Sequence, residues 1–160
     1  MRKVLIISAF SALGKTYLSR KNKKVLDFEA SFYRWLYKDE NLAKDVEKRK
    51  GVTDRIENPE YPQNYLNDLE EKMKQYDIIL ITPEKRIREM LQQRKIEYFL
   101  AYPTKPDFVV ERALKRGNNM AFSKGLEKTF KDWYPSEDEK VLWVEKDEYL
   151  EDVLIKNHLY

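Results

Sequence analysis

Short apolar runs alternate along the chain with stretches in which apolar residues recur at helical spacing. Continuous apolar runs are typical of buried strands, and amphipathic stretches are typical of helices. Pro62 and Pro83 have the positions of N-terminal helix residues, and Gly117 after Arg116 is a stop signal. The predicted strands are residues 3–8, 24–27, 77–82, 98–102 and 141–144. The predicted helices are residues 15–19, 31–37, 62–75, 84–94, 107–115, 120–131 and 148–155.

This alternation predicts an α/β fold with three layers. We expect a five-stranded, mainly parallel sheet with helices on both faces, and ligands at the carboxyl ends of the strands. A chain of 160 residues falls within the usual range of one domain and is long enough to bury such a core. We therefore treat residues 1–160 as a single domain.

The segment after the first predicted strand has the pattern A-x-x-x-x-G-K-T of a phosphate-binding loop. Lys15 is of the type and spacing that reaches the β- and γ-phosphate oxygens, and the Thr16 hydroxyl is placed to ligate Mg²⁺. Backbone N–H groups of the loop and of the following helix would converge on the phosphates. The predicted ligand is ATP or another nucleoside triphosphate. The predicted nucleotide-binding residues are Ala9, Ser11, Ala12, Leu13, Gly14, Lys15 and Thr16.

The loop departs from the ideal pattern at three positions. Ala9 stands where the first glycine is usual, and bulky Phe10 and Leu13 stand where nucleotide kinases often have further glycines. These departures bear on catalysis more than on nucleotide binding. The alternative is an ordinary strand-turn-helix corner in which G-K-T occurs by chance. The strand directly before the motif favours the phosphate loop.

Composition excludes several chemistries. The chain has no Cys, which removes disulfides, thiolate catalysis and Cys-based zinc sites. The lone His158 leaves no histidine metal cluster and no Ser/His/Asp triad. No apolar run approaches the roughly 20 residues of a membrane span, and the apolar segment after the basic start is too short for a signal peptide. We expect a cytoplasmic protein without a membrane partner. The net charge of +3 comes from interspersed acids and bases and does not indicate nucleic acid.

Asp27 closes the second predicted strand, and Glu29 follows two residues later. A carboxylate at this place faces the phosphate loop from a neighbouring strand, where Asp27 could hold Mg²⁺ or accept the proton of an attacking hydroxyl. Glu29 is a candidate contact for the substrate. The alternative is a solvated turn in which Ser31 caps the next helix.

Arg112 and Arg116 are spaced four residues apart on a predicted helix. This spacing stacks both guanidinium groups on one face, and such a pair could neutralise the charge of a transferring phosphoryl group. We count both as candidate catalytic residues with Lys15 and Asp27. The alternative is a basic solvated helix, paired with Asp107 and Glu111.

Residues 55–65 form a turn-rich approach to a helix. Arg55 could bind the phosphate of an acceptor, Tyr61 and Tyr65 could stack on a base, and Asn64 could donate or accept hydrogen bonds. Aromatic residues at helical spacing more often pack in the core, so that reading stays open for both tyrosines. Phe32 and Trp35 are predicted to complete the base pocket with Tyr61 and Tyr65.

Together these residues carry a resemblance that covers nearly the whole chain. The phosphate loop, Asp27, and residues 99–103 followed by Arg112 and Arg116-Gly117 resemble the P-loop nucleoside and nucleotide kinases, guanylate-kinase-like or adenylate-kinase-like. The chain also resembles small phage-associated proteins of this superfamily with the Asn-Pro-x-x-Pro-x-Asn-Tyr segment found at residues 58–65. The resemblance implies the P-loop NTPase fold with strand order 2-3-1-4-5. It also implies an acceptor-binding insertion at about 30–75 and a lid at about 116–135.

The resemblance and the residues together favour ATP- and Mg²⁺-dependent phosphoryl transfer onto a nucleoside, a nucleotide or a modified base, including modified DNA. One departure is Thr82, which ends the third strand where many family members carry an acidic residue. The second hypothesis is therefore a nucleotide-binding module without turnover. The third is a nucleic-acid-binding protein, indicated by the basic residues Arg20, Lys21, Lys23 and Lys24, which a surface turn also explains.

Overall fold

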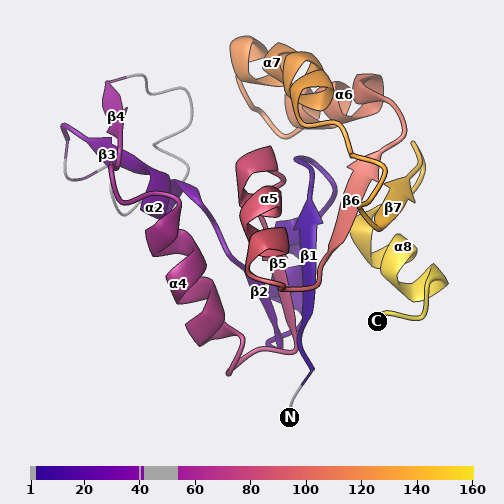
Figure 1. Ribbon diagram of the computed structural model, residues 1–160. Coiled ribbons are helices and arrows are strands. Elements are labelled where there is room, and N and C mark those ends of the chain that lie inside the picture. Colours follow the sequence, from indigo (N-terminus) through magenta and orange to yellow (C-terminus); the bar gives the residue numbers. More distant parts are fainter. Residues whose placement is uncertain (1–2, 40, 42–53) are drawn as a thin grey trace.

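The computed structural model describes residues 3–39, 41 and 54–160. Its centre is a five-stranded sheet in the order β2-β5-β1-β6-β7, in which each pair of neighbours is parallel (Figure 1). Counted along the chain, these are the five predicted strands in the predicted order 2-3-1-4-5. The strands are β1 (Leu5–Ala9), β2 (Val25–Asp27), β5 (Ile78–Ile81), β6 (Phe99–Pro103) and β7 (Val141–Val144).

The sheet is buried on both faces, which confirms the three-layer prediction. Successive residues of a strand point to opposite faces. Thus Ile7 and Leu80 belong to one apolar core, and Ile6 and Ile79 belong to the other. The first core is shared with α1 (Lys15–Lys21), α6 (Pro106–Lys115) and α8 (Leu150–Lys156). The second is shared with α4 (Gln63–Lys72) and α5 (Lys85–Gln93).

Two helices lie beyond the carboxyl end of β6 (Figure 1). They are α6 and α7 (Met120–Asp132), which pack on each other and are joined through Gly117 at φ +88°. A positive φ is a conformation that glycine adopts without strain, so Gly117 ends α6 as the sequence predicts.

The segment at residues 31–37 differs from the prediction of a single helix. The short helix α2 (Ser31–Arg34) gives way to β3 (Trp35–Tyr37), which pairs antiparallel with β4 (Arg55–Glu57). Aromatic residues favour strands, and here the partner strand is supplied by a segment far along the chain. Ser31 is also not the cap of α2, because Ala30 occupies that position.

Other helix ends shift by a few residues. Pro62 is the residue that precedes the first turn of α4, and Pro83 precedes the cap residue Glu84 of α5. Glu84 thereby becomes the first acidic residue beyond the carboxyl end of β5. Within residues 3–39, 41 and 54–160, no helix is both long and apolar enough to cross a membrane.

Candidate active site

Three neighbouring strands end at the same edge of the sheet and carry the predicted chemistry. The phosphate loop follows β1, Asp27 is the last residue of β2, and Thr82 to Glu84 follow β5. The Ser8 hydroxyl donates a hydrogen bond of 2.9 Å to the Thr82 carbonyl and so ties the β1 and β5 ends together. In parallel sheets, this edge is where ligands bind.

The phosphate loop has a compact backbone closed by its lysine. Lys15 Nζ donates a 2.8 Å hydrogen bond to the carbonyl of Ala9, and Gly14 precedes α1 with φ +97°. Ala12 also has a positive φ, +63°. No side chain caps the start of α1, so its first N–H groups face the loop as donors. This donor set fits a polyphosphate.

The bulky residues of the loop do not fill its phosphate cradle. Phe10 and Leu13 are fully buried, and the Phe10 ring packs edge-on against Tyr102 and Phe130 at centroid distances of 5.0 and 6.3 Å. Both side chains belong to the apolar core on one face of the sheet. The departures from the ideal pattern are therefore packing features and do not block a nucleotide.

A close approach explains the glycine of the loop pattern. A Cβ atom on Gly14 would lie 3.3 Å from Cδ1 of Tyr149, whose ring lies against the loop. Leu150 N donates a 2.8 Å hydrogen bond to the Leu13 carbonyl. The residues at the start of α8 thus pack against the phosphate loop and hydrogen-bond to it. The sequence analysis did not single out Tyr149, although Tyr149 and Asp152 have the spacing of a capping box.

Thr16 and Asp27 meet at the mouth of the loop. Thr16 Oγ1 donates a 3.0 Å hydrogen bond to Asp27 Oδ2. Among the described residues, no group of three or more His, Cys, Asp or Glu side chains could hold a metal by itself. A hydroxyl and one carboxylate fit Mg²⁺ because this ion keeps several waters and shares the phosphate oxygens of its substrate.

Arg112 lies against the phosphate loop and is not part of a solvated face. Its guanidinium donates hydrogen bonds to the carbonyls of Ala12 (3.2 Å), Lys146 (2.8 Å) and Glu148, and stacks on the Tyr149 ring at 4.0 Å. These contacts join α6, the loop and the segment before α8.

Arg116 follows Arg112 by one helical turn, because its backbone N–H donates a 3.1 Å hydrogen bond to the Arg112 carbonyl. Arg116 is exposed at the end of α6, where the helix closes. The alternative of a solvated, ion-paired helix holds for a different pair, Glu111 and Lys115, whose side chains lie 3.1 Å apart. Arg112 and Arg116 thus keep the predicted spacing but differ in their surroundings, since Arg112 contacts the loop and Arg116 is exposed.

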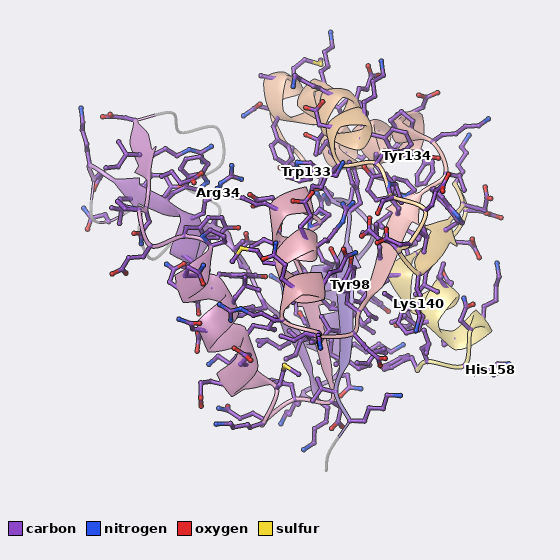
Figure 2. The ribbon with its side chains drawn as sticks, viewed as in Figure 1. Arg34, Tyr98, Trp133, Tyr134, Lys140 and His158 are labelled. Atoms are coloured by element: carbon purple, nitrogen blue, oxygen red, sulfur yellow. The ribbon has the colours of Figure 1, made fainter. Side chains whose placement is uncertain are left out.

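A second charged cluster joins α2, β4 and the start of α5. Glu57 Oε2 accepts hydrogen bonds from Arg34 Nε at 3.3 Å and is paired with Arg86 Nη2 at 2.9 Å. Arg86 Nε also donates to Glu84, and Arg34 Nη1 lies 3.6 Å from Glu84 Oε2. Figure 2 labels Arg34 on the side of the β3–β4 hairpin that faces α5. The sequence analysis missed Arg34, Arg86 and Glu84.

Tyr61 completes this cluster as a hydrogen-bond donor. Its hydroxyl donates to Glu84 Oε2 at 2.7 Å, and the guanidinium of Arg86 lies 4.9 Å from its ring centre. Burial, and then the Glu84 carboxylate, raise the pKa of Tyr61, so its hydroxyl stays protonated. The hydrogen bond from Arg86 lowers the pKa of Glu57 despite partial burial, so this carboxylate stays charged. Thus two arginines and two glutamates face one another at the site edge.

Several predicted acceptor contacts are structural instead. Tyr65 is fully buried, stacks on Phe28 at 4.5 Å and donates a 2.7 Å hydrogen bond to the Phe28 carbonyl. Tyr61 is 5% exposed, so neither tyrosine is open for base stacking and the alternative of core packing holds for both. Asn64 donates to the Tyr33 carbonyl and accepts from the Tyr65 amide, which uses both ends of its side-chain amide.

The remaining predicted acceptor residues lie nearer the surface. Phe32 is 48% exposed, and Arg55 stacks on Trp35 at 3.8 Å. Glu29 is exposed and accepts a 3.3 Å hydrogen bond from the Ser31 amide. This contact places Glu29 in the turn before α2, which is the alternative that the sequence left open.

A buried ion pair connects α5 with the segment after α7. Arg88 and Glu139 form a two-pronged pair at 2.8 and 2.9 Å, with side chains 1% and 2% exposed. Arg88 also donates to the carbonyls of Pro83 and Trp133. Figure 2 labels Trp133 and Tyr134 between α7 and the sheet. Arg88 thus connects Trp133, near the end of the predicted lid, with Pro83, which precedes Glu84.

One described cavity lies away from this edge. Its volume is about 330 Å³, and it is lined by residues that include Leu5, Tyr98, Phe99, Lys140 and His158. These residues lie near the amino ends of β1, β6 and β7, as the labels of Tyr98, Lys140 and His158 in Figure 2 show. In the basic segment at residues 20–24, Lys21 pairs with Glu151 at 2.6 Å.

Comparisons with known proteins identify the fold. No protein-family model matches the chain, and a comparison with curated proteins gives no match. Among solved structures, a gluconokinase from Sinorhizobium meliloti 1021 is similar with a TM-score of 0.54 and 14% sequence identity. The similarity covers 97% of this chain and 89% of that chain. Together with the strand order, it shows the three-layer fold of the P-loop kinases.

Proposed function

We propose that this chain, which has the P-loop kinase fold, is a phosphotransferase that uses ATP and Mg²⁺ and phosphorylates a nucleoside or nucleotide. The observation that carries the proposal is the hydrogen bond between Thr16 and Asp27 at the mouth of a loop closed by Lys15. It brings the three side chains that phosphoryl transfer needs for phosphate and metal to one edge of the sheet.

Each residue of the loop would have a defined task. Lys15 would exchange its contact with the Ala9 carbonyl for the terminal phosphates, and the Thr16 hydroxyl would turn to the metal. Bound Mg²⁺ would neutralise charge on the phosphate oxygens. Asp27 would then be free of Thr16 and able to hold a metal-bound water or accept the proton of the acceptor hydroxyl.

The acceptor would bind between the phosphate loop and the insertion at about 30–75. Arg34 and Arg86 offer planar guanidinium donors at this edge, which suit an anionic acceptor group better than lysines would. Residues at about 116–135, including α7, would act as a lid that carries Arg116 toward the transferring phosphoryl group. Arg112 would stay in place and keep the loop in shape.

A nucleotide-binding module without turnover is the second candidate. It is favoured by one observation: the Glu84 carboxylate beyond β5 is 4% exposed and already paired with Tyr61 and two arginines. Glu84 is therefore not available as a base, and the role of catalytic carboxylate would pass to Asp27.

A product screen separates the two candidates. ATP and Mg²⁺ are supplied with a panel of nucleosides, nucleoside monophosphates and DNA that contains modified bases, and phosphorylated product is measured. We expect acceptor-dependent ATP consumption that is lost in Lys15→Ala and retained in Lys23→Ala, which removes an exposed lysine far from the loop. ATP binding without product for any acceptor would favour the module, and wild-type ATP affinity in Lys15→Ala would contradict both.

A further inference from the structure

The cavity near the amino ends of β1, β6 and β7 follows from the register of the strands. β6 begins at Phe99, which lies opposite Ile7 of β1. β1 begins earlier, at Leu5, before its pairing with β6 starts. The space of about 330 Å³ is lined by Leu5, Tyr98 and Phe99, where these two strands are out of step.

Hydrogen bonds within the protein hold two walls of this cavity in place. The Tyr98 hydroxyl donates a 2.7 Å hydrogen bond to Glu139 Oε2 and accepts one of 3.0 Å from Gln92 Nε2. Leu159 N donates a 2.8 Å hydrogen bond to the Leu154 carbonyl, just after α8. Sites for small molecules are usually pre-formed and have volumes of about 300–1,000 Å³. The cavity is therefore suited in size to a compact ligand.

Most of the lining is apolar, and two of its side chains are aromatic rings. Leu5, Tyr98, Phe99 and Leu159 are partly buried and pack against the core that contains Ile7. Aromatic rings pair favourably with another flat ring in offset or edge-on contacts. The lining therefore favours a ligand whose body is a flat aromatic ring.

The charged residues of the lining have an excess of positive charge. Lys3 and Lys140 are exposed lysines of the lining, and Glu97 is its acidic residue, while His158 counts as neutral at pH 7. Within the part of the chain that the structure describes, neither lysine forms an ion pair. Lys140 Nζ lies 6.0 Å from the centre of the Phe99 ring, so one charge stands directly over an aromatic wall. This arrangement favours a ligand that carries a negative group next to its ring.

We propose that this cavity binds a small aromatic carboxylate, with its ring against Tyr98 and Phe99 and its charged group beside Lys140. The proposal goes beyond the proposed function, because the cavity lies near the amino ends of the strands and the phosphate loop follows the carboxyl end of β1. Figure 2 labels Tyr98, Lys140 and His158 on the side of the sheet away from α6 and α7. The site is thus separate from the one proposed for phosphoryl transfer.

The test is a titration with 2-naphthoate and with 2-naphthamide, which has the same ring without the charge, followed by the backbone amide signals in nitrogen-15 NMR spectra. We expect 2-naphthoate to shift the signals of Leu5, Phe99 and Lys140. It should bind about two- to fivefold more tightly than 2-naphthamide, the scale of one exposed ion pair. Lys140→Gln should reduce this preference by weakening the binding of 2-naphthoate alone. Lys131→Gln, which changes an exposed lysine of α7, is the matched control and should bind both probes like wild type.

A second measurement needs no substitution. Nuclear Overhauser effects between the naphthalene protons and the methyl groups of Leu5 and Leu159 in the wild type would place the ring in the cavity. Shifts confined to the phosphate loop at residues 9–16, or no binding of 2-naphthoate, would overturn the proposal. Equal affinity of the wild type for both probes, or an unchanged preference in Lys140→Gln, would also overturn it, because the negative group would then have no role in binding.

Discussion

Thr16 donates a hydrogen bond of 3.0 Å to Asp27, across the gap between the start of α1 and the end of β2. The two side chains belong to neighbouring elements of the same sheet edge, and Thr16 is the last residue of the phosphate-loop pattern. A hydroxyl and a carboxylate in contact form a pair of oxygen ligands that a divalent cation can enter. Their contact links the nucleotide side of the site to its carboxylate.

Substitution of Asp27 by Asn tests the role of its charge. The amide oxygen can still accept from Thr16, so we expect the fold and the ATP affinity to be retained. Acceptor-dependent turnover at saturating ATP should fall by about a hundredfold or more, because a positioned base contributes on that scale. The matched control is Glu29→Gln, since Glu29 is exposed and contacts the Ser31 amide. Normal turnover in Asp27→Asn with loss in Glu29→Gln would reverse the assignment.

Gly14→Ala should abolish triphosphate binding. Its φ of +97° strains any L residue, and the new Cβ would meet Tyr149 Cδ1 at 3.3 Å. The ring cannot easily yield because Arg112 stacks on it. The check is ATP-analogue binding by calorimetry together with a thermal melt. Gly125→Ala in α7 has open space around its Cβ and should leave the fold equally or more stable. Wild-type binding by Gly14→Ala would contradict the described loop geometry.

Arg112→Lys should lower stability and ATP affinity together. A lysine keeps the charge but cannot donate to the carbonyls of Ala12, Lys146 and Glu148 at once. We expect a loss of about 1–3 kcal/mol in the free energy of unfolding, the cost of leaving partly buried acceptors unpaired. Urea unfolding and analogue binding measure the two effects.

Arg116→Lys is predicted to behave differently because Arg116 is exposed. Its stability should match wild type, and the proposed lid requires a rate loss much larger than any loss of ATP affinity. Hydrogen exchange of α7 with and without ATP analogue plus acceptor gives an independent readout. Normal turnover together with unchanged exchange would remove the lid from the mechanism.

The Arg88–Glu139 pair makes stability depend on acid pH. Burial acts to raise the pKa of Glu139, but hydrogen bonds from Arg88, Ser136 and Tyr98 outweigh it and lower the pKa. A lowered pKa stabilises the fold above the ordinary glutamate value of 4.5 and loses that contribution as the pH falls through the folded-state pKa. Urea unfolding should therefore show a decrease in stability below this range.

Substituting one partner of this pair separates its contribution to stability from that of other acidic residues. Arg88→Met should cost about 3–5 kcal/mol because it leaves a buried carboxylate unpaired. Glu139→Gln should be less stable at neutral pH and should show a weaker dependence of stability on acid pH. Glu137→Gln, which changes an exposed neighbour, is the control and should keep the wild-type dependence of stability on pH. An identical acid profile in Glu139→Gln would assign the pH dependence to other groups.

Local patterns were sufficient for the sheet and the loop. The run Ile78–Ile81 is buried on both faces, which is why it is continuously apolar and can be recognised as a strand. The phosphate loop could likewise be predicted from its G-K-T motif after β1, because such a loop binds phosphate mostly through its own backbone. By contrast, the role of Tyr65 stayed open between packing and base stacking, because an aromatic residue on an amphipathic helix has the same sequence pattern in both cases.

The sequence by itself therefore determined the five strands of the sheet, the phosphate loop and the position of Asp27. Each of these depends on residues close together along the chain. Tertiary structure alone decided that Arg112 supports the loop and that Arg34, Glu57 and Arg86 meet. Those contacts join elements from different parts of the chain, and charged surface residues have no periodicity that indicates their partners. Their pairing depends on how the hairpin, α2 and α5 cross in space, because Coulomb attraction and hydrogen bonding act over a few ångströms regardless of separation along the chain.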